Sequence, residues 1–444
     1  MKVVIAGAGE VGTHLARMLS KEDHDIVLLD DSQERLSKIS SEVDLMTVIG
    51  SAHSFSDLKK TDLAKADLFI GVTPFEERNV LACAMAKYLG VNRTIARINN
   101  QEYLQERYRT KLNDMGINEL IYPESLAAKE IVASVKQTVT RQMIEFSNGK
   151  LLLLGIKVRD NAPILNKTFE ELAIEHQHLL VVAIKRDNDT IIPNGHDSIQ
   201  NDDVVFFITT PSEQTNVLEL TGKKQFDVKN IMFMGGSRIA QKAVEKLGES
   251  YRIKIIESDR ERCEEIADRF SNVLVINGDG RNLDLLKEEG IDKMDAFVAT
   301  TGNSETNILG CNLAKTLGVR RTVAEVENLA YMKLADNTGI GSIINKKLIA
   351  ASYIYRFTLN AEISKVKCLT ASEAEVFEFI AKPGAKITQK PVKDLGFPAE
   401  AKIGGVIRGN MGYIAHGYTQ VQEGDKVVVF TLPAGIKKIE KFFK

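Results

Sequence analysis

The sequence predicts an α/β protein with two doubly wound parallel-sheet (Rossmann-like) domains, each followed by a small α+β domain. Three observations predict this fold: a long internal repeat, an alternation of apolar runs with segments of helical period, and a glycine-rich loop directly after the first apolar run. The repeat is the most informative of the three, because a duplicated unit decides the whole architecture. A chain of 444 residues has room for three or four domains.

The internal repeat relates the two halves of the chain. Residues 79–94 recur as residues 307–322, an offset of 228 that also carries Gly7 to Gly235 and Asp67 to Asp295. A second pair of matching segments, 198–211 and 419–433, has an offset of 222. The chain therefore divides into four parts, which we call N1 (1–141), C1 (142–226), N2 (227–363) and C2 (364–444).

In the N parts, short apolar runs alternate with segments of helical period. The strands expected in N1 are Val3–Ala6, Asp25–Leu29, Asp44–Ile49, Asp67–Val72, Thr94–Ile98 and Glu119–Tyr122. The helical segments between them include Val11–Leu19, Arg35–Ser40 and Asn79–Leu89. This alternation predicts a parallel, doubly wound sheet. The C parts are short and β-rich with frequent turn signals, which predicts a small regulatory α+β module.

Composition excludes several classes of protein. With 58 Lys and Arg against 60 Asp and Glu, the formal net charge is −2, which argues against a nucleic-acid partner. The longest apolar runs fall far short of the ~20 residues that cross a bilayer. The start of the chain runs straight into a strand and a glycine loop, unlike a signal peptide. The four cysteines form no Cys-x-x-Cys pair, so we expect a cytoplasmic protein without a disulfide framework or zinc site.

The first glycine loop predicts a dinucleotide site in N1. Residues 7–12 read Gly-Ala-Gly-Glu-Val-Gly, between the first strand and the first helix. In this motif, Gly7 permits the turn, Gly9 lets the backbone approach a pyrophosphate, and Gly12 allows the helix to pack closely. The helix N-terminus favours phosphate. Asp30, at the end of the second strand, would accept hydrogen bonds from a ribose, which favours NAD or an adenosine nucleotide over NADP.

Other strand ends are expected along the same edge of the sheet, because open α/β sheets bind ligands at their carboxyl edge. Ser51 follows the third strand, and Thr73 and Pro74 follow the fourth. Thr73 could contact the ligand or cap the next helix. Arg97 ends the fifth strand, where it could contact a ligand or partner, or pair with Glu76 or Glu77.

The second glycine loop departs from the motif. Residues 235–240 read Gly-Gly-Ser-Arg-Ile-Ala, so Ser237 places a Cβ where the backbone should meet phosphate. Glu257 keeps the acidic position at the end of the next strand. Asp279 and Thr301 follow later strands and are expected along the same edge of the N2 sheet. Arg238 could add a phosphate contact or lie on the surface. N2 is thus expected to bind a nucleotide more weakly or with another preference, or to be a crevice kept only for architecture.

A catalytic constellation is missing from the sequence. A dehydrogenase needs a proton donor or base beside the nicotinamide. None of the seven histidines recurs at the repeat offset, and His176 and His178, which would share one face of a strand, lack the further ligands of a metal site. Two nucleotide crevices without catalytic groups favour a sensor in which binding biases one conformation, so we expect neither an enzyme nor a metal site.

Together these motifs resemble the TrkA family, the cytosolic NAD-binding regulatory subunits of bacterial Trk potassium uptake systems, with tandem RCK (KTN) domains. The motifs that carry the resemblance are the loop at residues 7–12, Thr-Pro-Phe-Glu-Glu-Arg-Asn at 73–79, Thr-Ile-Ala-Arg at 94–97, Lys-Asp-Leu-Gly at 393–396 and Gln-Glu-Gly-Asp-Lys-Val-Val-Val at 422–429. The resemblance covers the whole chain. The duplicated form is characteristic of this family.

The resemblance implies a subunit on the inner face of the cell membrane, bound to a TrkH-like integral-membrane potassium transporter and assembled as a homo-oligomeric ring, such as a tetramer. It implies binding of NAD or NADH, and in some members of ATP or ADP. The binding positions carried over are Gly7, Ala8, Gly9, Glu10, Val11, Asp30, Ser51, Thr73, Pro74 and Arg97 in N1, and Gly235, Gly236, Ser237, Arg238, Ile239, Glu257, Asp279 and Thr301 in N2. The helices expected at Pro123–Val135 and Lys346–Leu359 would pack on a partner subunit, or else on their own domain.

Two other functions compete with this interpretation. An NAD-dependent oxidoreductase would turn over NADH, but the chain offers no substrate domain with a proton donor. A soluble nucleotide sensor that acts on another partner would not associate with a pore protein.

Overall fold

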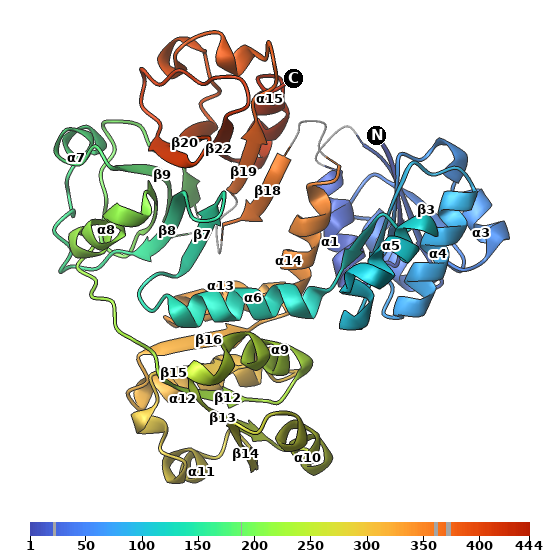
Figure 1. Cartoon of the computed structure of the whole chain (residues 1–444), viewed down its shortest axis with the longest axis horizontal. Helices are drawn as coiled ribbons and strands as arrows, with labels where there is room; N and C mark the ends of the chain where they lie inside the picture. The colour runs from blue at the N-terminus through green and yellow to red at the C-terminus, as the bar shows by residue number, and fades with distance from the viewer. Residues whose placement is uncertain (21–23, 188, 359–362, 370–373) are drawn as a thin grey trace. The chain divides into compact units, whose positions relative to one another are not determined.

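The computed structural model describes residues 1–20, 24–187, 189–358, 363–369 and 374–444. Within these residues the chain forms four β-sheets (Figure 1), of which the first and third are parallel and the second and fourth antiparallel. This confirms the predicted fold class. The boundaries at 141, 226 and 363 remain a proposal based on the sequence.

The N1 sheet has six parallel strands in the order β3-β2-β1-β4-β5-β6. The strands are β1 (Lys2–Ala6), β2 (Asp25–Asp30), β3 (Met46–Ile49), β4 (Leu68–Gly71), β5 (Arg93–Arg97) and β6 (Glu119–Ile121). The helices between them are α1 (Glu10–Leu19), α2 (Gln33–Ser40), α3 (Phe55–Lys60), α4 (Glu76–Tyr88) and α5 (Glu106–Asp114). The strand order reverses between β1 and β4, which is where doubly wound sheets open a crevice at their carboxyl edge.

Helix α1 shows why these segments fold as the sequence predicts. Val11, Leu15 and Leu19 recur at helical spacing and are buried against the sheet, and Leu15 and Leu19 are completely so. Burying each leucine contributes roughly 2 kcal/mol of hydrophobic free energy. The helix starts at Glu10, directly after the glycine loop, so its N-terminus faces the crevice.

The N2 sheet repeats this topology, in the order β14-β13-β12-β15-β16-β17. Its strands are β12 (Asn230–Met234), β13 (Arg252–Glu257), β14 (Val273–Asn277), β15 (Ala296–Ala299), β16 (Arg321–Glu325) and β17 (Ser342–Ile344). Its helices are α9 (Arg238–Leu247), α10 (Arg260–Arg269), α11 (Leu283–Glu288), α12 (Ser304–Thr316) and α13 (Leu329–Asn337). The sequence repeat is therefore a repeat of structure.

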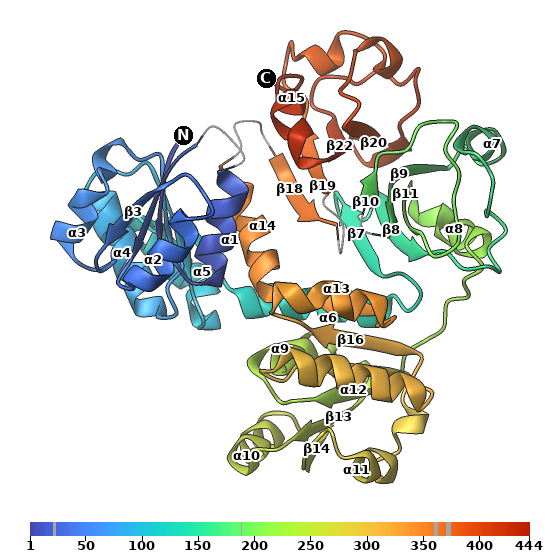
Figure 2. The same ribbon diagram turned by 180° about the vertical axis from the view of Figure 1, so that it is seen from behind.

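The C1 and C2 sheets are antiparallel and share one apolar core. Their strand orders are β10-β9-β11-β8-β7 and β18-β19-β22-β20-β21. The C1 elements are β7 (Gln142–Phe146), β8 (Leu151–Lys157), α7 (Phe169–Glu175), β9 (Leu179–Arg186), β10 (Asp189–Ile191), β11 (Val204–Thr209) and α8 (Gln214–Leu220). The C2 elements are β18 (Ile363–Cys368), β19 (Glu375–Ile380), β20 (Ala401–Arg408), β21 (Met411–Ile414), β22 (Lys426–Thr431) and α15 (Ile436–Glu440). Phe206 from β11 and Phe430 from β22 lie in the same buried cluster. Strand β20 of C2 lies beside strand β9 of C1 (Figure 2).

The C parts also repeat one ion pair. The Arg186 guanidinium donates to both oxygens of Asp203, at 3.0 and 2.8 Å, and Arg408 donates in the same way to Asp425, at 2.9 and 2.7 Å. Both aspartates are nearly inaccessible to solvent. The sequence offset of 222 thus matches residues with the same structural task.

Two helices leave the N part that precedes them in sequence. By their contacts, the described residues form two units: residues 1–126 with 346–359, and residues 127–345 with 360–444. Helix α14 (Lys346–Tyr355), which follows the last N2 strand, belongs to the first unit and packs against α1 (Figure 1). Helix α6 (Pro123–Lys136), which follows the last N1 strand, passes into the second unit. Helix α14 therefore packs on the other repeat of the same chain, whereas the sequence suggested a partner subunit or its own domain. Its predicted end, Leu359, lies outside the described residues.

One lysine between the C parts makes stability depend on pH. The Lys402 ammonium in β20 donates to the carbonyl of Pro193 in C1, at 2.8 Å. Burial lowers the pKa of Lys402 from 10.5 to about 8. Between these two values the unfolded chain binds more protons than the folded chain, so the free energy of unfolding rises with pH across this window.

We therefore compare the native chain with Lys402→Met by urea unfolding at pH 7 and at pH 10. The native chain should gain on the order of 2 kcal/mol relative to the variant between these pH values. Lys437→Met, which replaces an exposed lysine of α15, serves as the control, and we expect no such change for it. A stability difference for Lys402→Met that is the same at both pH values would contradict the lowered pKa.

Candidate functional site

The surroundings of the three glycines in the N1 loop differ, and so does the effect that a side chain would have at each position. Gly7 has φ +114°, and a Cβ there would lie 2.9 Å from the backbone nitrogen of Thr73. A Cβ on Gly12 would lie 1.9 Å from the carbonyl oxygen of Gly7. Gly9 has an extended backbone (φ −71°, ψ −177°), and no protein atom lies within 4 Å of where its Cβ would stand. The fold requires glycine at positions 7 and 12 but not at position 9.

Asp30 fastens the loop to the second strand. Its carboxylate accepts hydrogen bonds from the backbone N–H of Ala8, at 2.6 Å, and of Ser32, at 2.9 Å. Arg35 lies 3.7 Å from the same carboxylate, which is almost fully buried. A carboxylate has about four lone-pair positions, so Asp30 can hold the loop and still accept a hydrogen bond from a ligand hydroxyl.

The loop borders a cavity of about 500 Å³ at the carboxyl edge of the N1 sheet. Eight of the ten predicted N1 residues line it: Gly7, Ala8, Gly9, Glu10, Val11, Asp30, Pro74 and Arg97. Ser51 and Thr73 are not among the lining residues. The Ser51 hydroxyl lies 2.8 Å from Nδ1 of His53, and the Thr73 hydroxyl donates to the Asn79 side chain, at 2.7 Å.

The cavity carries an excess of positive charge that the motif did not reveal. Six cationic side chains line it, against the two carboxylates of Glu10 and Asp30: Arg17, Arg35, Lys38, Arg97, Lys346 and Lys347. Such a surface attracts an anionic ligand. Arg35 and Lys38 lie in α2, the helix that directly follows Asp30, so their place in the sequence does indicate that they lie near the site. The two lysines come from α14, whose position beside α1 no local pattern indicates.

Arg97 pairs differently from the expected ion pair. Its guanidinium lies 3.9 Å from the carboxylate of Glu124, and its Nε has no hydrogen-bond partner among the described residues. Glu76 instead accepts hydrogen bonds from the backbone N–H groups of Asn99 and Asn100, at 2.7 and 2.8 Å. Of the two alternatives that the sequence left open for Arg97, the ion pair with Glu76 or Glu77 does not form, and Glu76 holds the turn after β5.

A buried asparagine ties neighbouring strand ends together in each repeat. The Asn79 amide donates to the carbonyls of Thr73 and Arg97, at 3.0 and 2.9 Å. Asn307 repeats this with Thr301 and Glu325, at 3.0 and 2.8 Å. Thr73 therefore helps to orient this asparagine and is not the N-cap of α4, which is Phe75. The same side-chain hydrogen bonds therefore join the strand ends at the crevice edge in both N parts.

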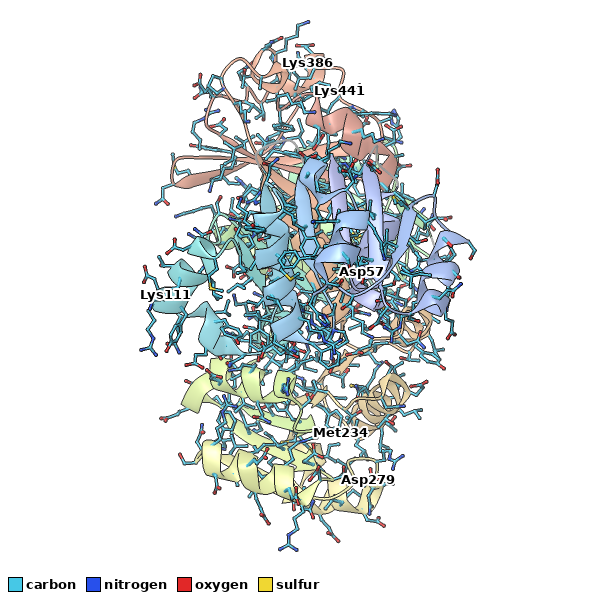
Figure 3. The ribbon with its side chains drawn as sticks, turned by 90° about the vertical axis from the view of Figure 1, so that its right-hand side faces the viewer. Asp57, Lys111, Met234, Asp279, Lys386 and Lys441 are labelled. Carbon is cyan, nitrogen blue, oxygen red and sulfur yellow. The ribbon has the colours of Figure 1, made fainter. Side chains whose placement is uncertain are left out.

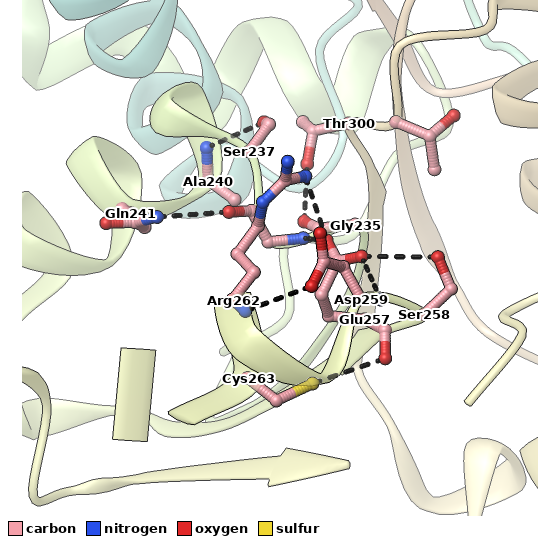
Figure 4. Close-up of polar contacts among 12 residues, drawn as sticks. Gly235, Ser237, Ala240, Gln241, Glu257, Ser258, Asp259, Arg262, Cys263 and Thr300 are labelled. Carbon is pink, nitrogen blue, oxygen red and sulfur yellow. Dashed lines mark hydrogen bonds and ion pairs between the residues drawn. The ribbon is translucent and has the colours of Figure 1, made fainter. Parts of the chain in front are cut away.

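The N2 loop has the same backbone frame (Figure 4). Gly235 has φ +95°, and the Gly236 N–H donates to the carboxylate of Glu257, at 2.8 Å, as Ala8 does to Asp30. Glu257 also accepts from the N–H of Asp259, at 2.9 Å, and lies 3.5 Å from Arg262. The acidic position predicted from the sequence is thus occupied by equivalent groups in both repeats.

Three of the other predicted N2 residues make hydrogen bonds within the protein: Ser237, Asp279 and Thr301. The Ser237 hydroxyl accepts from the N–H of Ala240, at 3.4 Å, and so caps α9. Asp279, labelled in Figure 3, accepts from the Arg281 guanidinium, at 2.7 Å, which lowers the pKa of Asp279. The Thr301 hydroxyl donates to Asn307, at 2.6 Å. Arg238 and Ile239 open the helix α9.

Groups suited to metal chemistry do not gather in the part of the chain that the structure describes: no cluster of three or more His, Cys, Asp or Glu side chains could hold a metal ion. His176 ends α7, and His178 lies in the turn before β9, so the idea that both share one face of a strand was wrong. Cys83, Cys263 and Cys311 are buried free thiols, and the side chain of Cys368 lies outside the described residues. Among the described residues, no helix has both the length and the apolar character needed to cross a bilayer.

Comparison with known proteins gives a consistent result. The chain matches the TrkA-N domain over residues 3–123 and 231–346, and the TrkA-C domain over residues 153–222 and 376–444. It is 30% identical to the Trk system potassium uptake protein TrkA homolog 1 of Methanosarcina mazei, over all of both chains. It is also 30% identical to the Trk system potassium uptake protein TrkA of Halomonas elongata, over all of this chain and 99% of that one. The fold is similar to that of a GsuK channel bound to NAD, with a TM-score of 0.61, 17% identity, and coverage of all of this chain and 78% of that one.

Proposed function

The chain belongs to the TrkA family, and from this premise we propose that it is a nucleotide-sensing regulatory subunit of a membrane potassium uptake protein. In this proposal NAD or NADH binds in the N1 crevice, and ATP or ADP competes for it. The ligand's pyrophosphate lies at the N-terminus of α1, and its ribose lies beside Asp30.

The observation that carries this proposal is Gly9. Nothing in the protein requires glycine there, since its backbone is extended and its Cβ would enter open space. A residue at this position with a side chain would stand between the helix N-terminus and the cavity. The absence of a side chain is therefore explained by close approach of a ligand to the backbone. The six cationic side chains around the cavity favour phosphate in that place.

Nucleotide binding in N1 has a direct route to the second half of the chain. Lys346 and Lys347 belong to α14, which follows the N2 sheet, yet they line the N1 cavity. Lys347 pairs with Glu10 at the start of α1. A ligand that meets these groups changes the free energy of the contact between α1 and α14, and so biases the conformation of an element outside N1. This arrangement suits sensing, and we propose no enzymatic activity.

The potassium path in this proposal belongs to a partner. The relatives are named potassium uptake proteins, and this chain offers no membrane-crossing helix among its described residues. We therefore place the subunit on the inner face of the cell membrane, bound to a TrkH-like transporter, as a homo-oligomeric ring of four copies. Co-purification of the tagged chain with a membrane protein that conducts potassium tests the partner, and light scattering tests the ring. Association with other proteins alone would favour a free-standing sensor.

Asp30→Ala tests the ligand site. The variant removes the acceptor for the N–H groups of Ala8 and Ser32, so the loop loses its frame and the ribose loses an acceptor. We expect the Kd for NADH to rise by about tenfold to a hundredfold, and stability to fall by about 1–3 kcal/mol, since buried N–H groups lose their partners. Calorimetric titration with NADH, NAD, ATP and ADP measures the affinities, and thermal unfolding measures the stability.

The neighbouring exposed carboxylate provides a matched control, because Asp31→Ala removes the same charge without touching the loop. Asp30→Asn, which keeps one carbonyl acceptor, should fall between the native chain and Asp30→Ala. Equal NADH affinity in all these variants would refute the N1 assignment. Steady oxidation of NADH in the presence of simple carbonyl compounds would revive the oxidoreductase alternative.

A further inference from the structure

The two crevices of the chain differ in charge at equivalent positions. In N1, the charged residues that line the cavity from its own repeat are four cations and two carboxylates: Arg17, Arg35, Lys38 and Arg97 against Glu10 and Asp30. The equivalent N2 residues are two cations and four carboxylates: Arg238 and Arg262 against Glu245, Glu257, Glu265 and Glu325. The sign of the balance is therefore inverted, although the backbone frame is the same.

The inversion includes a whole ion pair. In N1, Arg17 on α1 donates to Glu42, at 2.7 Å, and it is the arginine that lines the cavity. The equivalent N2 residues are Glu245 and Arg269, which pair at 3.4 Å with the charges exchanged. Lys242 also pairs with Glu245, at 2.7 Å. In both repeats the two charges pair with each other. The residue at the position that lines the N1 cavity is a cation in N1, Arg17, and a carboxylate in N2, Glu245.

The helix N-termini differ in the same direction. The N-cap of α1 is Gly9, which makes no side-chain hydrogen bond, so the first N–H groups of α1 remain available to a ligand. The N-cap of α9 is Ser237, whose hydroxyl already accepts from the N–H of Ala240. Ser237 also brings a Cβ to the position that is open in N1. The N2 helix N-terminus is thus capped by the protein itself.

We infer that a phosphorylated dinucleotide binds only the N1 crevice, one per chain, and that Ser237, Glu245, Glu265 and Glu325 exclude its phosphates from N2. This inference rests on the proposed function, because it assigns that function to one of the two crevices. The expectation of a nucleotide in N2 gives way here to a second repeat that has kept the frame of the site but not its anion-binding surface. The carboxylates act electrostatically, since like charges repel phosphate, whereas Ser237 acts through its capping hydroxyl and its Cβ.

The first experiment is calorimetric titration of the full chain with NADH, to determine the number of binding sites. We expect one equivalent per chain. Two equivalents per chain would overturn the inference and leave the proposed function standing. No binding at all would overturn both.

The second experiment transfers the N2 charges to N1. The variant Arg17→Glu/Glu42→Arg reverses the ion pair as N2 has it without changing the net charge, and Lys38→Glu is added to copy Glu265. We expect the Kd for NADH to rise at least about tenfold, with less dependence on salt concentration. The thermal transition reports whether the variant is folded, and the single variant Lys38→Glu, on an exposed side chain, should show part of the effect even if the reversed pair does not fold.

The reciprocal variant serves as the matched control. Glu245→Arg/Arg269→Glu with Glu265→Lys gives N2 the charges of N1 and leaves the N1 cavity untouched. We expect the first equivalent of NADH to bind with unchanged affinity. A changed affinity of that equivalent in the N2 variant, with native affinity in the N1 variant, would place the bound nucleotide in N2 and overturn the inference.

Discussion

Replacing Gly9 by asparagine is expected to raise the Kd for NADH by about a hundredfold or more while leaving the chain as stable as before. Asparagine is a good N-cap residue, and the extended backbone at position 9 accepts it without strain. Its side chain would take the helix N–H groups that the ligand's phosphates need, and it would stand in the open space beside the cavity. Titration calorimetry measures the loss of affinity, and thermal unfolding checks the fold.

The second repeat supplies the control for this experiment. Ser237→Asn exchanges one capping side chain for another at the equivalent position, so it should change neither NADH affinity nor stability. Native affinity in Gly9→Asn would show that no ligand approaches the backbone there, and that the glycine loop serves the fold alone.

Replacing Arg321 by methionine is expected to cost about 3 kcal/mol of stability, because three acceptors, two of them in buried hydrogen bonds, lose a charged donor. Arg321 is buried in the second unit, where it donates to the carbonyls of Ser134 and Thr140, at 2.8 and 2.9 Å, and to the hydroxyl of Ser342, at 2.8 Å. Burial lowers its pKa to about 10, so it stays cationic at neutral pH. Ser134 lies in α6, so the arginine holds a helix of the first repeat against a strand of the second.

The equivalent residue of the first repeat is Arg93, which provides a matched control. Its side chain is about half exposed, lies 4.6 Å from the centre of the Phe357 ring and pairs with Glu119 at 4.0 Å. Exposed contacts of this kind contribute little, so Arg93→Met should cost less than about 1 kcal/mol. Urea unfolding of both variants makes the comparison. Equal losses would mean that the acceptors around Arg321 find other donors, and that the buried arginine does not hold α6.

The sequence predicted most of the fold because the repeat and the periodicity are local signals. Each strand expected in N1 overlaps an observed strand, and the helix expected from Asn79 begins three residues earlier, at Glu76. The offset of 222 likewise relates Arg186 to Arg408, and the structure shows that both arginines form the same ion pair. In each case a residue and its neighbours in sequence contain the necessary information.

The sequence did not predict which of the two structural units α6 and α14 pack into. The apolar spacing of α14 is the same whether it packs on its own sheet or on α1, so its pattern could not separate these possibilities. For this reason Lys346 and Lys347 were not recognised as residues of the N1 cavity, although they belong to its lining. The partner of Arg97 was missed for a related reason, since Glu124 follows another strand and Glu76 is engaged by a turn.

The crossed helices have a consequence for how such a chain can evolve. If the two halves were separate and identical, each would exchange its helix with another copy, and any substitution would change both members of the pair at once. In one continuous chain the exchange takes place between halves that are always present in equal number. One half can then lose a ligand while the other keeps it, because a half that no longer binds never has to pair with itself. A single chain that contains both halves can therefore keep them unequal.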